Sequence, residues 1–206
     1  MVTTFYPPHN FGGDGIYVQR LTQALLNAGH HVEVFYNKEA YETLAKRTPL
    51  MSAPHAQAPC SGLPRLSTLL IQQTGKPVLI KNQIKHFLKR DWDVIHFHNT
   101  SLLGAPEIFK YGDALKFYTT HEYWLLCPMH LLFKYDKSPC KKKNCISCSL
   151  VFKRPPQLWR YKKNWKDKLQ HIDCFLSPSQ FCRTKHIEEG IKQPIHHLPL
   201  FIPPVA

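Results

Sequence analysis

Four cysteines in the middle of the chain have the spacing of metal ligands. Cys127, Cys140, Cys145 and Cys148 form the pattern C-x12-C-x4-C-x2-C. Four thiolates are a common ligand set of tetrahedral structural zinc, and the metal then stabilises a segment that has little core of its own. The residues around them are polar and rich in lysine, so we favour structural zinc over four free thiols. Catalytic zinc is disfavoured, because four cysteines leave no open position on the metal.

The same region is strongly basic. The 206-residue chain has a formal net charge of +13, and segment 134–168 contains twelve Lys and Arg against two Asp, which is +10 of that total. Such a patch attracts phosphates, nucleic acid or anionic lipid headgroups. The sequence predicts a helix over 156–170 with Leu158, Trp165 and Leu169 roughly on one face. That helix either packs onto a sheet, the more common arrangement, or lies in a membrane interface.

A glycine-rich loop, Phe11-Gly12-Gly13-Asp14-Gly15, separates an expected strand at the start of the chain from an expected helix over 15–28. Asp14 has the residue type that caps a helix. Glycine lets the backbone approach a ligand closely, and a helix amino terminus offers free N–H groups to an anion. The alternative is a tight turn that requires positive φ. The spacing is not GxGxxG, which disfavours a dinucleotide site.

Strands and helices alternate along the rest of the chain. The proline-rich stretch 39–76 is expected to be a surface excursion without catalytic residues, and the tail 196–204 to be extended. We therefore predict an α/β fold with a Rossmann-like, doubly wound, mostly parallel sheet and a Cys-rich basic insertion at about 127–155. The expected strands cover 31–36, 93–98, 115–120 and 174–178, and the expected helices cover 78–88, 102–111 and 180–189.

Bulk features indicate a cytoplasmic protein. No apolar run approaches the roughly 20 residues that cross a bilayer, and no signal peptide opens the chain. The seven cysteines are an odd number, which favours thiols or a metal site in a reducing compartment over a disulfide framework.

Four segments, in order, resemble family 4 glycosyltransferases, which have the GT-B fold of two Rossmann-like domains facing a cleft. They are TTFYPPHNFGGDGIYVQRLTQALLNAGHHVEVF, DVIHFHNTSLLG, FYTTHEYWLLCP, and FLSPSQFCRTKHIEEGI followed by HHLPLFIPP. The resemblance implies that residues 1–206 are the amino-terminal, acceptor-side domain. It also implies that the carboxyl-terminal domain, which binds the nucleotide-sugar donor, is absent and that the chain alone is inactive.

The resemblance assigns roles to single residues. Gly12 and Gly13 match the loop that approaches the donor phosphates or the acceptor. His121 matches the histidine beside the transferred sugar, where an imidazole can hydrogen-bond a sugar hydroxyl or ease charge separation. Glu122 stands where many relatives have Asp, and it is expected to contact substrate.

In the segment HFHN, His98 and Asn99 match acceptor-side residues near the floor of the cleft, and His96 is expected to pack. The resemblance implies retaining transfer to a glycan or a lipid-linked acceptor, with no cofactor required for catalysis. Segment 134–168 is then a candidate for peripheral contact with the inner face of the cell membrane.

Two hypotheses from other classes remain open: a basic, zinc-stabilised nucleic-acid-binding module, and a sugar- or nucleotide-binding domain without catalysis. Nucleic acid is not the expected partner, because the chain has one CxxC unit where such modules usually have two.

Overall fold

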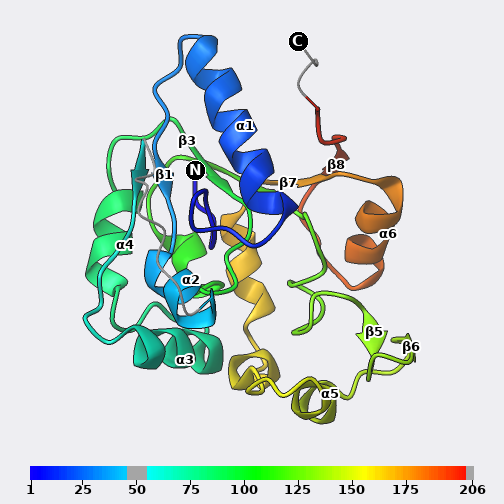
Figure 1. Ribbon diagram of the computed structural model, residues 1–206. Helices are drawn as coiled ribbons and strands as arrows, with labels where there is room; N and C mark the ends of the chain where they lie inside the picture. Colours follow the sequence, from blue (N-terminus) through cyan, green and yellow to red (C-terminus); the bar gives the residue numbers. More distant parts are fainter. Residues whose placement is uncertain (46–54, 203–206) are drawn as a thin grey trace.

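The computed structural model describes residues 1–45 and 55–202. Parts of the expected surface excursion and of the expected extended tail, residues 46–54 and 203–204, lie outside the described residues. A parallel sheet forms the centre of the fold (Figure 1). Four strands pair side by side in the order β3 (Val94–Phe97), β4 (Leu115–Thr119), β7 (Cys174–Ser177) and β8 (Ile195–His197).

The strand order is that of a Rossmann-like fold. β1 (Val34–Phe35) pairs in parallel with β2 (Ala56–Gln57). Val2 forms parallel bridges to Phe35 and to Phe97, so it lies between β1 and β3. If the segment at Val2 is counted as the first strand, the order across the sheet is 3-2-1-4-5-6-7. The chain reverses its direction of progress between Val2 and β3, and ligands of such sheets bind outside the carboxyl ends of the strands at that point.

Helices cover both faces of the sheet. α1 (Gly13–Asn27) lies on one face, over the half-buried side chains of His96 and Phe117. The other face forms the main core, in which Ile95, Phe97 and Tyr118 pack with α4 (Lys81–Leu88). The doubly wound, mostly parallel α/β fold is confirmed. The remaining helical elements up to β4 are α2 (Lys38–Ala45), α3 (Pro64–Thr74) and the 3-10 helix η1 (Glu107–Lys110), and α6 (Gln180–Glu188) follows β7.

The start and the cap of α1 differ from those expected from the sequence. The helix begins two residues earlier than expected, and its cap is Gly12, which makes no side-chain capping bond. Asp14 lies in the first turn, where its Oδ1 accepts a hydrogen bond from the Gly15 N–H at 2.9 Å. The expectation that Asp14 is the cap is therefore wrong. Gly29, with φ of +87°, follows the last turn as expected.

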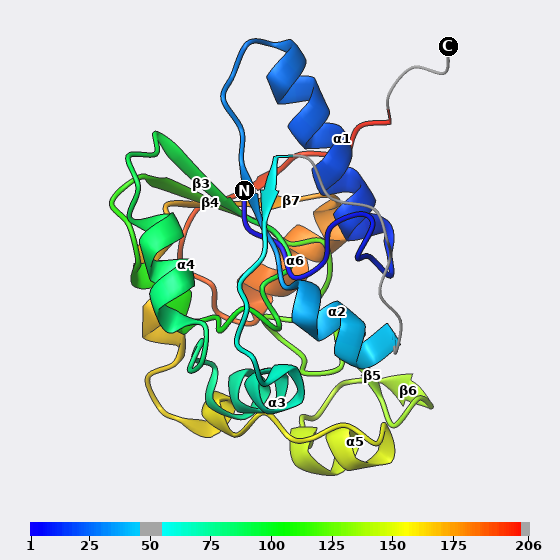
Figure 2. The ribbon, with the colours of Figure 1, turned by 60° about the vertical axis from the view of Figure 1, so that its left-hand side comes forward.

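The Cys-rich insertion leaves the sheet after β4 and the chain returns at β7. It contains an antiparallel hairpin, β5 (Phe133–Lys134) with β6 (Ser138–Pro139), and the short helix α5 (Cys145–Val151). Both ribbon views show α5 at the end of the molecule away from α1 (Figures 1 and 2).

The expected helix over 156–170 is wrong. The segment forms two 3-10 helices, η2 (Leu158–Tyr161) and η3 (Lys166–His171), separated by extended backbone at Lys162. Trp159 and Trp165 make an edge-to-face contact with ring centroids 5.2 Å apart. Side chains six positions apart point to different sides of an α-helix, so this contact requires the break.

Candidate active site

Two histidines meet at the carboxyl ends of neighbouring strands. His98 follows β3 and His121 follows β4, and His98 Nδ1 lies 2.9 Å from His121 Nε2. His98 is 1% exposed. Beneath them, His96 Nε2 lies 2.8 Å from Thr119 Oγ1, and the rings of His96 and His98 have centroids 4.0 Å apart. The parallel register of β3 and β4 thus brings the two predicted site histidines together and packs His96 below them.

Both members of the pair are neutral at neutral pH. Burial lowers the pKa of His121 to about 4, against a smaller opposing effect of the Asp14 carboxylate. Burial also holds the pKa of His98 well below its usual value, and the neighbouring His96 and His121 add to this effect. One imidazole must therefore donate to the other. His98 Nε2 is buried and has no hydrogen-bond partner among the described residues.

The unpartnered Nε2 of His98 determines which nitrogen carries the proton in each of the two imidazole rings. A proton on His98 Nε2 would be a buried donor without an acceptor, which is costly. We therefore assign the His98 proton to Nδ1, from which it is donated to His121 Nε2. The proton of His121 is then on Nδ1, and that N–H is available as a hydrogen-bond donor.

The glycine loop has open space above its first two glycines. Gly12 has an extended backbone, with φ of −149°, and neither Gly13 nor Gly15 has positive φ. A Cβ atom at Gly13 would meet nothing within 4 Å, and at Gly12 it would meet only Asp14 Oδ1 at 3.5 Å. The turn interpretation, which requires positive φ, is therefore wrong for these glycines. Neither packing nor backbone conformation requires glycine at positions 12 and 13.

Gly15 is different, because a Cβ atom there would lie 2.2 Å from Asn10 Oδ1 and 2.9 Å from the Phe5 carbonyl oxygen. This glycine is required by packing.

A hydrogen bond joins the glycine loop to the loop after β3. Asn99 Nδ2 donates to Asp14 Oδ2 at 3.1 Å, and Asn99 Oδ1 accepts from Ser101 Oγ at 2.7 Å. The two loops follow the strands that flank the reversal point of the sheet. The predicted residues Gly12 and Asn99 thus belong to one surface, and Asp14 connects them.

A cavity of about 720 Å³ opens at this edge of the sheet. One wall comes from the glycine loop and Asn99, and the opposite wall comes from the insertion and the residues that follow it. Asp14 is the one carboxylate among the lining residues that the structure describes. The lining residues that the sequence did not single out include Phe5, Leu44, Thr68, Gln72, Ser101, Met129, His130, Leu131 and Gln157.

Two of the missed residues, Thr68 and Gln72, lie on α3, in the stretch 39–76 that was expected to be an irregular surface excursion. No local pattern could indicate that α3 faces the glycine loop, because the contact is long-range. Lys153 and Arg154 belong to the basic segment 134–168 that the sequence singled out, but the sequence did not place them opposite the glycine loop.

Of the six predicted site residues, Gly12 and Asn99 line this cavity, whereas Gly13, His98, His121 and Glu122 do not. The Glu122 carboxylate lies against the His130 ring of the insertion, and His130 lines that wall of the cavity. His121 lies against Tyr17 of α1, with ring centroids 5.3 Å apart, and Tyr17 also contacts Phe201.

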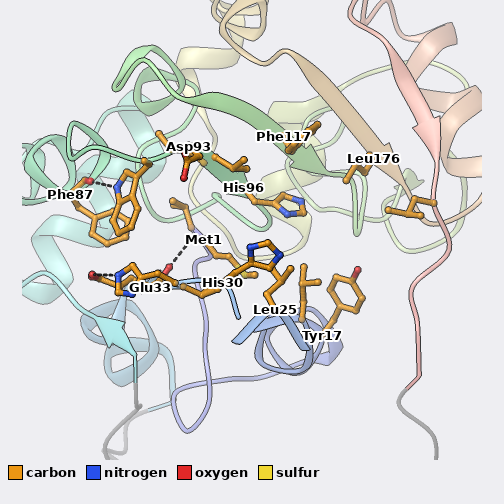
Figure 3. A pocket seen from close by; sticks show the side chains of 18 residues that line it. Met1, Tyr17, Leu25, His30, Glu33, Phe87, Asp93, His96, Phe117 and Leu176 are labelled. Atoms are coloured by element: carbon orange, nitrogen blue, oxygen red, sulfur yellow. Dashed lines mark hydrogen bonds and ion pairs between the residues drawn. The ribbon is translucent and has the colours of Figure 1, made fainter. Parts of the chain in front are cut away.

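A second cavity, of about 430 Å³, lies between α1 and the sheet toward the amino ends of the strands (Figure 3). Its lining is mainly apolar, and it encloses the Met1 ammonium group, which donates to the Glu33 carbonyl at 2.6 Å. Burial lowers the pKa of this ammonium to about 5. None of the residues predicted to bind substrate lines this cavity. It is at the wrong end of the sheet for a substrate site.

The four cysteines of the insertion also come together. Cys127, Cys140, Cys145 and Cys148 all line one small cavity of about 10 Å³, and all are free thiols. Within residues 1–45 and 55–202, no three His, Cys, Asp or Glu side chains are already arranged to hold a metal ion.

Comparison with known proteins agrees with this geometry. The family model described as Glycosyltransferase Family 4 matches residues 11–205. The chain belongs to this family.

A solved structure supports the fold of this family 4 chain. Sucrose-phosphate synthase from Thermosynechococcus elongatus matches with a TM-score of 0.54 at 16% sequence identity. The match covers 96% of the family 4 chain and 47% of the synthase, so the chain spans about half the length of that structure. No curated protein matches the sequence. Among the described residues of the family 4 chain, no helix has the length and apolar character needed to cross a membrane.

Proposed function

We propose that this family 4 domain binds the acceptor of a glycosyltransferase, which transfers a sugar from a nucleotide-sugar donor with retention of anomeric configuration. The observation that carries the proposal is the 720 Å³ cavity at the reversal point of the sheet, which joins the glycine loop to the insertion. The chain spans about half of the synthase that it resembles in fold. We therefore assign donor binding to a second Rossmann-like domain and expect no transfer from this chain alone.

The site residues have separate roles in this proposal. His121 donates its Nδ1–H to a hydroxyl of the transferred sugar. The open backbone at Gly12 and Gly13 lets the donor phosphates or the acceptor approach. The leaving phosphate takes the proton of the acceptor hydroxyl on the same face of the sugar. Protein groups hold the diphosphate, so the reaction requires no metal cofactor for that purpose. The domain contributes orientation and electrostatic stabilisation.

The cavity favours an acceptor that carries a negative charge. Lys153 and Arg154 line one side, and neither forms an ion pair with any residue that the structure describes. On the other side, Phe11 is 52% exposed, and its ring lies 4.7 Å from that of Tyr41. Exposed aromatic rings can pack on the apolar face of a sugar, and unpaired cations bind phosphate or carboxylate.

Acceptor binding can be tested without the donor domain. We expect a phosphorylated or uronate-containing oligosaccharide to give saturation-transfer NMR signals with this chain, and a neutral oligosaccharide to bind more weakly. Arg154→Ala should weaken binding of the charged sugar by roughly tenfold, since it removes one charge-assisted contact. Lys192→Ala, an exposed cation outside the cavity, is the matched control. Absence of binding to every oligosaccharide would contradict the proposal.

A second observation favours an anionic membrane as the place where the acceptor is met. Five apolar side chains of α5 and η2 are more than 40% exposed: Ile146, Leu150, Val151, Leu158 and Tyr161. Lysines precede α5 at 141–143 and follow η2 at 162 and 163. Exposed apolar side chains rimmed by lysines are typical of contact with anionic lipid headgroups. This face replaces the single helix that the sequence predicts, in which Leu169 and Trp159 are in fact buried. We propose the cytoplasmic face of the cell membrane as its location.

Vesicle flotation tests this location. The chain should float with vesicles that contain phosphatidylglycerol and should not float with phosphatidylcholine alone. The double variant Leu150→Glu, Val151→Glu should lose flotation, whereas Leu63→Glu, at a residue that is 56% exposed on another part of the surface, should retain it. A parallel titration with short DNA and RNA at two salt concentrations tests the nucleic-acid alternative. Tight binding with a steep salt dependence would favour that alternative.

A further inference from the structure

We propose that Cys127, Cys140, Cys145 and Cys148 together bind one structural zinc ion. The four side chains come from three separate segments: the loop after β4, the end of the β5–β6 hairpin, and α5. The fold brings all four to the same small cavity, which they line together with Lys134 and Asn144. Four thiols that converge from three segments are the donor set of tetrahedral structural zinc, and they leave no position for a substrate.

The size of the cavity fits a small ion. Its volume is about 10 Å³, close to the space of a single water-sized sphere. The sulfurs are not yet in a metal-holding arrangement within the described part of the chain. In a zinc site each sulfur is about 2.3 Å from the metal, so the thiols must close around the ion. Rotation of the cysteine side chains about their first torsion angle moves each sulfur without breaking the sheet or the hairpin.

One backbone N–H near the cysteines donates a hydrogen bond to sulfur, and a second backbone hydrogen bond fixes the hairpin. The Tyr135 N–H donates to Cys148 Sγ at 3.5 Å, which ties the turn of the hairpin to α5. The Cys140 N–H donates to the Leu132 carbonyl at 2.8 Å and fixes the other end of the hairpin. Hydrogen bonds to the ligand residues and their backbone orient the ligands before the metal binds.

The insertion has few other sources of stability. Its own hydrophobic cluster contains Cys127, Met129 and Cys148 as buried members, so two of the three are proposed ligands. Five residues without the freedom of glycine have positive φ in the insertion: His130, Leu132, Tyr135, Asp136 and Lys153. A backbone held in disfavoured conformations with so small a core requires a cross-link. No disulfide is present among the described cysteines, and a metal ion supplies the cross-link.

The charge of the groups around the four cysteines also favours a zinc–thiolate centre. A zinc ion with four thiolates carries a net charge of −2, after the four thiol protons have passed to solvent. Arg160 lies close enough to Cys127 and Cys145 for their charges to act on its guanidinium group. In the described part of the chain Arg160 has no ion-pair partner; it donates to Gln157 Oε1 and to the carbonyl oxygens of Trp124 and Leu125. The Glu122 carboxylate also acts on this guanidinium group, and the zinc–thiolate centre would add further negative charge beside it.

Metal analysis of the full chain, purified after expression with zinc in the medium, tests the proposal. We expect about one zinc per chain. Replacement of zinc by Co²⁺ should give the strong sulfur-to-cobalt charge-transfer absorption and the visible bands of a tetrahedral four-thiolate site. Cys140→Ser and Cys145→Ser should each lower the zinc content by about tenfold or more, and Cys60→Ser, at an exposed cysteine outside the cluster, should leave it unchanged.

Two outcomes would overturn the proposal. One is a folded wild-type chain that contains no zinc after expression with the metal and develops no charge-transfer band with Co²⁺. The other is a loss of zinc in Cys60→Ser as large as that in Cys145→Ser. If the serine variants fail to fold, the cobalt spectrum of the wild-type chain decides the question alone.

Discussion

His98 determines the protonation of His121. The 2.9 Å contact joins Nδ1 of the first to Nε2 of the second, and the buried Nε2 of His98 has no other partner in the described chain. The ring nitrogen of His98 that carries the proton therefore determines which ring nitrogen of His121 carries one. The sequence places both residues after strands, but it does not show that one controls the other.

Nitrogen NMR should reveal this control. In the chain labelled with 15N-histidine, the shifts and couplings at pH 7 should show His121 protonated at Nδ1 and bare at Nε2. His98→Phe removes the donor, so His121 should change to a mixture of tautomers or to the more common Nε2 form. His197→Gln, at an exposed residue, should change neither. A wild-type spectrum with His121 protonated at Nε2 would refute the assignment.

The buried histidines should make the domain unstable in acid. Burial lowers the pKa of His121 to about 4 and that of His96 to about 3, from about 6.5 in an unfolded chain. Below pH 6.5 the unfolded chain binds more protons than the folded one. The stabilisation is therefore complete above about pH 6.5 and is lost as the pH falls toward 4 and then 3.

We expect the free energy of unfolding to drop by at least about 2 kcal/mol between about pH 7 and pH 4.5, measured by urea titration at several pH values. His96→Gln keeps a group that can hydrogen-bond Thr119 but cannot titrate, so its pH dependence should be shallower. His197→Gln should follow the wild type. Equal slopes in all three proteins would show that the buried histidines are not responsible.

Substitutions at two positions of the glycine loop should have different effects on stability and on binding. Gly13→Ala should change the free energy of unfolding by less than about 1 kcal/mol, because its Cβ meets open space. Gly15→Ala should cost about 2 kcal/mol or more, since its Cβ would overlap the Phe5 carbonyl and the Asn10 side chain. Thermal unfolding of the two variants measures both stability changes. In the saccharide titration, Gly13→Ala should bind more weakly although it is folded. Equal stability losses for the two variants would contradict this account.

Arg160 should be essential for holding together the two segments that flank the insertion. Its guanidinium group lies over the rings of Trp159, at 4.4 Å, and of Trp124, at 5.0 Å, and it donates to two backbone carbonyls. Lysine cannot make these contacts in parallel. Arg160→Lys should therefore cost about 2 kcal/mol of folding free energy. Arg154→Lys, on an exposed side chain, is the matched control, and a similar loss there would argue against a special role for Arg160.

Sequence reasoning recovered the features that depend on local periodicity. The strands at 94–97, 115–119 and 174–177 lie within the predicted ranges because each combines an apolar run with flanking turn residues. The predicted helix over 156–170 is wrong because the packing of Trp159 against Trp165 outweighs helix propensity. The cavity could be predicted only in part. Gly12 and Asn99 lie in recognisable motifs, whereas Gln72 enters through a contact between segments far apart in sequence.

The cavity is shared between the edge of the sheet and the insertion. One wall is the edge of the sheet, and the other is carried by a segment that leaves after β4 and comes back at β7, the strand beside it. A segment whose ends enter and leave at neighbouring strands can be exchanged as a cassette while the parallel scaffold remains in place. Under the proposed function, we expect that transplanting residues 127–155 between family members changes the choice of acceptor and leaves the proposed role of His121 unchanged.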